Sequence, residues 1–167
     1  MASSLKNLSA FESAVPSAEN MSFGIVVAEW NGDITEKLLK GAVSLLKSKG
    51  CKDMDIIVKK VPGTFELTLG SQLLCEHTDV DAVIALGCVI QGETRHFDFI
   101  CHAVSQGLNH VALEYNTPVI FGVLTTDNLQ QAEDRAGGKH GNKGEEAAAT
   151  AIKMVALKEE LSEGEDI

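Results

Sequence analysis

The chain has 167 residues, of which 44% are hydrophobic and 23% charged, as is typical of one compact globular domain and unlike a disordered chain. Acidic residues outnumber basic ones by 24 to 14 and give a formal net charge of −10, the wrong sign for a protein that binds nucleic-acid phosphates. No apolar run is long enough to span a bilayer, so we expect neither nucleic acid nor a membrane as a partner.

Strand-like and helix-like segments alternate along most of the chain, after a polar start at residues 1–20 that we expect to be a flexible arm. In chain order the predicted elements are a strand at 22–29, a helix at 35–49, a strand at 55–61, a helix at 66–76, a strand at 81–90, a helix at 97–113, a strand at 119–124, a short helix at 127–136 and a long helix that ends near 161. We assign residues 21–158 to a single domain. The acidic residues 159–167 form a tail that we expect to fray, because acids oppose the dipole at a helix C-terminus.

Four apolar strands separated by helices predict a parallel sheet that is covered on both faces. We therefore expect an α/β protein, a three-layer α/β/α sandwich of the flavodoxin-like type with four parallel strands and right-handed crossovers. In such sheets ligands bind beyond the carboxyl ends of the strands.

Two pairs of polar residues predict where the last two helices begin, namely Asp127 with Gln130 and Asn142 with Glu145. The last helix is apolar on more than one face, which suggests that another subunit covers it in addition to its own sheet. An Ala-rich sequence selected only for helix propensity is the alternative.

The four cysteines lie at positions 51, 75, 88 and 101, without C-x-x-C spacing and without histidines at ligand spacing. We expect no metal site and no redox motif, and interpret the cysteines as reduced, buried residues of a cytoplasmic protein.

Aromatic residues gather where the predicted strands end. Four of the eight aromatic residues lie at these points and could stack on a flat ligand: Trp30, Phe65, Phe97 and Phe121. For Trp30, at a strand-to-loop junction, we favour a ligand contact. For Phe97 we favour the alternative that it caps the core.

The segment Gly87–Thr94 has the spacing of a phosphate-binding loop, but Glu93 stands where the lysine of that motif belongs, which argues against a nucleoside triphosphate. Free N–H groups at the start of the following helix favour a single phosphate, and a plain turn with a threonine cap is the alternative. His96, in the first turn of that helix, could shuttle protons or be merely structural.

A basic, glycine-rich loop, Arg135–Gly144, stands out in this acidic chain. Arg135 could clamp a phosphate with its planar guanidinium. The alternative is a solvated turn between two helices.

Five segments together resemble the 6,7-dimethyl-8-ribityllumazine synthase family. They occur in the family's order and are Trp30–Asn31, Pro62–Leu67, Gly87–Phe97, Phe121–Thr125 and Arg135–Gly144. The resemblance covers essentially residues 22–157, and Thr68 departs from it where family members commonly carry proline.

The resemblance implies a condensation of two small molecules without cofactor or metal. In that reaction 5-amino-6-(D-ribitylamino)uracil attacks 3,4-dihydroxy-2-butanone 4-phosphate through its amine. A Schiff base forms, phosphate is eliminated, and ring closure with loss of water gives the lumazine.

The resemblance also implies roles for particular residues. Trp30 would stack on the pyrimidine, with Phe65 at the base of the ribityl chain, and His96 would move protons. Asn31, Thr64 and Glu66 would bind the ribityl chain, while Cys88, Val89 and Ile90 would line the pyrimidine pocket. Gly92, Glu93 and Thr94 would hold the phosphate, and Phe121, Arg135 and Lys143 would come from the neighbouring subunit, with Arg135 on the phosphate.

Members of the family form pentamers, and some assemble twelve pentamers into an icosahedral shell. Residues 137–144 match the short turn of the shell-forming members, so we favour the shell, with riboflavin synthase as a possible partner. Two other readings stay open: a non-catalytic flavin or phosphate binder of the same fold, and a shell-forming scaffold with a vestigial site.

Overall fold

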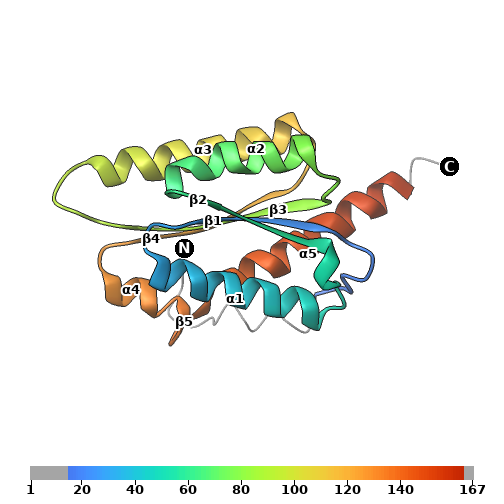
Figure 1. Ribbon diagram of the computed structural model, residues 1–167, viewed down its shortest axis with the longest axis horizontal. Helices are drawn as coiled ribbons and strands as arrows, with labels where there is room; N and C mark the ends of the chain where they lie inside the picture. The colour runs from blue at the N-terminus through green and yellow to red at the C-terminus, as the bar shows by residue number, and fades with distance from the viewer. Residues whose placement is uncertain (1–14, 164–167) are drawn as a thin grey trace.

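A computed structural model describes residues 15–163 of the chain (Figure 1). Four parallel strands form a sheet in the order β2–β1–β3–β4. The strands are β1 (Phe23–Ala28), β2 (Ile56–Val61), β3 (Ala82–Ile90) and β4 (Val119–Thr126). Helices α2 (Leu67–His77) and α3 (His96–Glu114) cover one face, and α1 (Gly32–Ser48), α4 (Leu129–Glu133) and α5 (Lys143–Glu163) lie on the other. The predicted three-layer α/β/α sandwich is confirmed.

The central strands are apolar throughout because both of their faces are covered. In β1, Ile25 and Val27 join the core beneath α1 and α5, whereas Val26 and Ala28 join the core beneath α2 and α3. Strand β2 lies at the sheet edge, and its exposed Lys59 and Lys60 suit a position open to water.

Helices α1 and α5 pack closely enough for their backbones to touch. A Cβ added to Gly144 would lie 1.9 Å from the carbonyl oxygen of Leu38. A Cβ added to Gly41 would lie 2.6 Å from the side chain of Asn142. Glycine at these two positions lets the start of α5 lie directly on α1.

Helix starts differ from the predictions where a polar residue takes another role. Helix α1 begins at Gly32, three residues before the predicted start, because the left-handed Asn31 (φ 58°) places its carbonyl to accept from Ile34 and Thr35. Helix α4 is capped by Asn128, whose Oδ1 accepts from the backbone N–H of Gln131 at 2.9 Å. The predicted pair Asp127 and Gln130 was therefore wrong by one residue.

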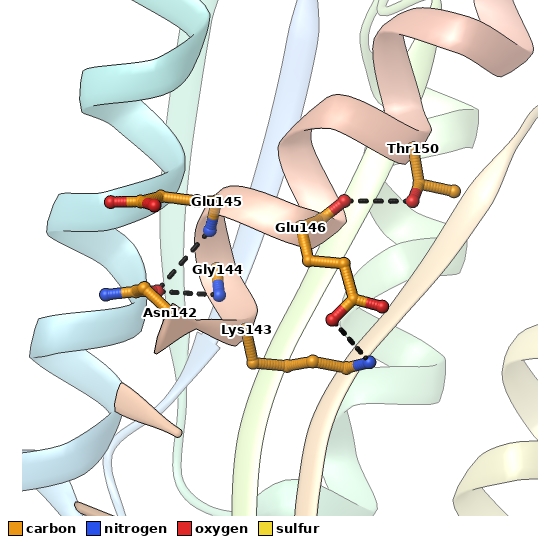
Figure 2. A network of polar contacts seen from close by, with 6 residues as sticks. All are labelled: Asn142, Lys143, Gly144, Glu145, Glu146 and Thr150. Atoms are coloured by element: carbon orange, nitrogen blue, oxygen red, sulfur yellow. Dashed lines mark hydrogen bonds and ion pairs between the residues drawn. The ribbon is translucent and has the colours of Figure 1, made fainter. Parts of the chain in front are cut away.

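The loop after α4 is more ordered than we expected. Residues Ala136–Gly138 (β5) and Gly141–Asn142 (β6) form a small antiparallel hairpin in place of a simple turn between helices. Asn142 caps α5, as predicted, with its Oδ1 accepting from Gly144 at 2.8 Å and Glu145 at 3.4 Å (Figure 2).

The two ends of the described chain are more regular than we predicted. In the predicted N-terminal arm, Val15 and Ala18 are buried, and the N–H of Ala18 donates to the carbonyl of Lys49 at 2.8 Å. The rest of that arm, residues 1–14, lies outside the described residues. Residues 159–163 of the predicted tail continue α5, and residues 164–167 also lie outside.

Candidate functional site

A cavity of about 670 Å³ opens at the carboxyl ends of β1, β2 and β3, beside the start of α3. This is the place where ligands bind in open parallel α/β sheets. Its lining residues are Trp30, Asn31, Gly63, Thr64, Phe65, Glu66, Cys88, Val89, Ile90, Gly92, Thr94, His96, Phe97 and Ile100. We call it the strand-end cavity.

Trp30 and Asn31 form the wall that follows β1. Backbone pairing with the segment after β2 continues past the strand, with Trp30 N donating to Pro62 O at 3.1 Å. The Asn31 amide donates to the carbonyl of Cys88 at 2.9 Å and so ties the end of β1 to the end of β3. Trp30 itself is 72% exposed, which leaves its ring available to a ligand.

A second wall is a 3-10 turn at Thr64–Glu66 that leads into α2. Thr64 is buried over β3, where Gly87 makes room, since a Cβ there would lie 2.9 Å from Thr64 Oγ1. Phe65 is 55% exposed and Glu66 is exposed, so a flat hydrophobic ring and a carboxylate both reach this end of the sheet.

The end of β3 forms the remaining wall. The Cys88 side chain lies in the core beneath α1 and α5, and burial raises the pKa of its thiol to about 11. It is therefore a protonated, unreactive thiol at neutral pH. Gln91 N donates to Thr126 O at 2.8 Å, which holds the end of β3 against β4.

Backbone amides and an imidazole meet at the start of α3. Gly92, Thr94 and His96 all line the cavity, and the Thr94 hydroxyl accepts from the N–H of His96 at 3.4 Å. Unpaired N–H groups at a helix N-terminus favour an anion. The predicted phosphate residue Glu93 is exposed and is not among the lining residues.

Three lining residues were not among the predicted site residues. Gly63 borders the Glu66 carboxylate, since a Cβ there would lie 3.0 Å from Glu66 Oε2. Phe97 lines the cavity and is only partly buried, which differs from its predicted role as a cap of the core. Ile100 follows His96 by four residues and so lies on the same side of α3, a spacing that could have identified it.

The remaining predicted residues lie elsewhere in this chain. Phe121, Lys143 and Glu146 line a separate hollow of about 440 Å³ at the edge strand β4, beside α5. Arg135 is joined to them through the backbone, because Lys143 N donates to Arg135 O at 2.9 Å. We call Phe121, Arg135, Lys143 and Glu146 the β4–α5 cluster.

The chemistry of the strand-end cavity is incomplete in one respect. Aromatic rings, a carboxylate, a hydroxyl, an amide, helix N–H groups and an imidazole are all present, and they suit a flat polar ligand with an anionic group. No lysine or arginine is among the lining residues. The basic residues Lys143 and Arg135 lie instead in the β4–α5 cluster.

Within residues 15–163, no group of three or more His, Cys, Asp or Glu side chains is arranged to hold a metal ion. All four cysteines are free thiols, with Cys51 and Cys88 buried and Cys75 and Cys101 partly buried. None of the helices in the described part of the chain is long and apolar enough to cross a membrane.

Known proteins resemble this chain over nearly its whole length. The model of the family described as 6,7-dimethyl-8-ribityllumazine synthase matches residues 20–159. A protein of that name from Cytophaga hutchinsonii is 63% identical over 156 residues, which are 93% of this chain and 98% of the relative. Those from Parabacteroides distasonis and Phocaeicola vulgatus are 57% and 55% identical, covering 93% and 96% of this chain and 98% and 96% of the relatives. The matched region contains both the strand-end cavity and the β4–α5 cluster.

Proposed function

The chain belongs to the 6,7-dimethyl-8-ribityllumazine synthase family, and we infer from this that it makes 6,7-dimethyl-8-ribityllumazine for riboflavin biosynthesis. The amine of 5-amino-6-(D-ribitylamino)uracil attacks the ketone of 3,4-dihydroxy-2-butanone 4-phosphate. Loss of water gives a Schiff base, phosphate leaves, and ring closure with loss of a second water completes the product. We propose that the reaction takes place in the strand-end cavity, in a cytoplasmic enzyme.

The pyrimidine and its ribityl chain fit the walls formed by the ends of β1, β2 and β3. Trp30 stacks on the pyrimidine, because an exposed indole at the cavity rim offers a flat apolar face. Cys88, Val89 and Ile90 line the ring through the end of β3. The polar groups of Asn31, Thr64 and Glu66 bind the ribityl hydroxyls, with Phe65 beside them.

The phosphate binds at the start of α3, where Gly92 and Thr94 line the cavity and Glu93 lies next to them. His96, the first residue of α3, moves protons during Schiff-base formation and phosphate loss. Arg135 of a neighbouring subunit supplies the cation that the cavity lining lacks, and a guanidinium binds phosphate through two parallel N–H groups.

A site completed by a neighbouring copy requires a homo-oligomer, and we propose a pentamer. The cavity and the β4–α5 cluster lie on different parts of the chain, so copies joined head to tail form a closed ring in which every site is complete. Large exposed apolar side chains support such contacts: Leu69 and Leu73 on α2, Phe99 and Leu113 on α3, and Leu157 on α5. We further propose that twelve pentamers form a 60-subunit shell and that riboflavin synthase is a partner.

One observation carries the proposal. The strand-end cavity has helix N–H groups that suit a phosphate but no basic side chain, and Arg135 lies in the β4–α5 cluster of the same chain. The test is to mix the two substrates with the purified protein and follow the absorbance of the lumazine, while sedimentation measures the assembly. Product formation by pentamers or larger particles is expected. A stable monomer that makes the product would overturn the shared site, and an inactive assembly would overturn the enzyme.

A further inference from the structure

Lys143 and Glu146 line the hollow beside β4 and form an ion pair. The Lys143 Nζ lies 3.0 Å from Glu146 Oε2, and the two side chains are 27% and 26% exposed (Figure 2). By contrast, in the nearby pair of Lys139 with Asp134 the lysine side chain is 67% exposed. The limited exposure of Lys143 and Glu146 reduces screening of their pair by solvent.

The backbone that carries this pair is held firmly in place. The amide of Asn142 caps α5 with its oxygen and donates from its nitrogen to Lys37 O of α1 at 3.0 Å. Glu146 lies in the first turn of α5, where its carbonyl accepts from the Thr150 hydroxyl at 2.8 Å (Figure 2). The backbone of Lys143 is therefore fixed, and its ion pair with Glu146 restrains the conformation of its side chain.

The two cations of the β4–α5 cluster differ in how their charge is compensated. The Arg135 guanidinium donates to the carbonyl oxygen of Gln131 at 3.0 Å, and within residues 15–163 it pairs with no carboxylate. The Lys143 ammonium is paired with Glu146. Arg135 thus keeps a full positive charge for an anion, whereas the Lys143–Glu146 pair is neutral and still offers hydrogen-bond donors and an acceptor.

We propose that Glu146 is a positioning residue that holds Lys143 for the ribityl hydroxyls and keeps phosphate away from it. The inference rests on the proposed function, in which a neighbouring subunit completes the strand-end cavity, and on the resemblance to the family, which implies that Lys143 comes from that neighbour and binds the pyrimidine substrate. A neutral pair with donors and an acceptor matches hydroxyl groups, which both donate and accept. A bare ammonium in the same cluster as Arg135 would attract the phosphate of the second substrate into the place of the ribityl chain.

The test compares Glu146→Gln with Glu145→Gln in the assembled full-length protein. Both variants remove one negative charge from the first turn of α5, so their effects on the helix dipole are matched. For Glu146→Gln we expect the KM of the pyrimidine to rise about fivefold, more than kcat falls, and inorganic phosphate to inhibit several times more strongly against the pyrimidine. Glu145→Gln should leave both quantities close to those of the unchanged protein.

A double-mutant cycle separates this role from a purely structural one. Once Lys143→Met has removed the ammonium, adding Glu146→Gln should raise the pyrimidine KM no further and should not strengthen inhibition by phosphate. Additive effects, or a Glu146→Gln variant that behaves like Glu145→Gln, would overturn the positioning role. The activity of the unchanged protein tests the proposed function separately, so the two failures are distinguishable.

Discussion

The strand-end cavity and the β4–α5 cluster are built from the same chain by different means. The cavity is formed by the exposed ends of three strands, and its aromatic rings, carboxylate and imidazole are largely open to water. In the cluster, the functional side chains contact their own chain: Arg135 bonds a carbonyl and Lys143 pairs with Glu146. One region is open to a ligand, and the other holds its cations in fixed positions.

The two regions supply different chemical groups to the proposed site. Open strand ends and a helix N-terminus supply stacking surfaces and backbone amides, which need little support from neighbouring side chains. A long basic side chain takes a defined orientation only when its backbone is held in place. The β5–β6 hairpin and the capped start of α5 hold the backbone of Arg135 and Lys143.

Gly144→Ala should have the largest effect, because its new Cβ would lie 1.9 Å from the Leu38 carbonyl and force α5 away from α1. We expect a loss of about 3 kcal/mol in the free energy of unfolding, measured by urea denaturation. Gly32→Ala is the matched control, since no atom lies within 4 Å of a Cβ at that position. Equal stability of the two variants would contradict the close packing of the two helices.

Arg135→Ala should raise the KM for the phosphate substrate and lower kcat/KM by roughly a hundredfold, because one charged hydrogen-bonding group is removed from the transition state. Steady-state kinetics with each substrate varied in turn measures both changes. Arg135→Lys keeps the charge without the planar fork and should recover only part of the activity. If Arg135→Ala lowered the melting temperature alone, the residue would be structural.

His96→Ala should slow turnover by about tenfold or more, within the range for a general acid–base group. Binding of the pyrimidine, measured by fluorescence titration of Trp30, should change little, because His96 lies at the start of α3 and Trp30 at the end of β1. Unchanged turnover would refute the role in proton transfer.

Mixed assemblies of these two impaired variants test whether the cavity and the cluster meet between subunits. After the two variants are dissociated, combined in equal amounts and reassembled, about a quarter of the sites should hold both an intact His96 and an intact Arg135. Activity should therefore rise above the mean of the two separate variants only after they are mixed and reassembled. A mixture that is no more active than this mean would place each site within one chain.

Tyr115→Phe should have the smallest effect, since it lies in neither region. The Tyr115 hydroxyl donates to Glu76, which holds the pKa of Glu76 below its ordinary 4.5 and raises that of Tyr115 above 10.0. The stabilisation by Glu76 is present above pH 4.5 and is lost as pH falls through the lowered pKa. The stabilisation by Tyr115 is present below pH 10.0 and is lost as pH rises through the raised pKa. The variant should weaken both dependences in melting curves from pH 3 to 11, with no effect on the KM of either substrate.

The sequence predicted the sheet well, because strands buried on both faces must be apolar and their spacing leaves room only for helical crossovers. It predicted most of the cavity for the same reason, since the ends of parallel strands meet at one edge. The sequence did not predict that α1 begins directly after Asn31, or that residues 136–142 form a hairpin. A left-handed residue and a two-residue strand leave no periodic pattern in the sequence. The pairing of Lys143 with Glu146 was not predicted, because it depends on side-chain rotamers that leave no pattern in the sequence.

The path of α5 has a practical consequence for attaching other molecules to this protein. Its C-terminal half passes the beginning of β4, where Lys158 Nζ bonds Asn116 O at 2.7 Å, and it extends beyond the other elements (Figure 1). Val15 lies near the end of α1, at the same end of the sheet. An affinity tag, dye or fused protein attached at Val15 or at the end of α5 would therefore lie where the strands begin. The strand-end cavity lies where the strands end, so the attachment leaves its entrance open to substrates.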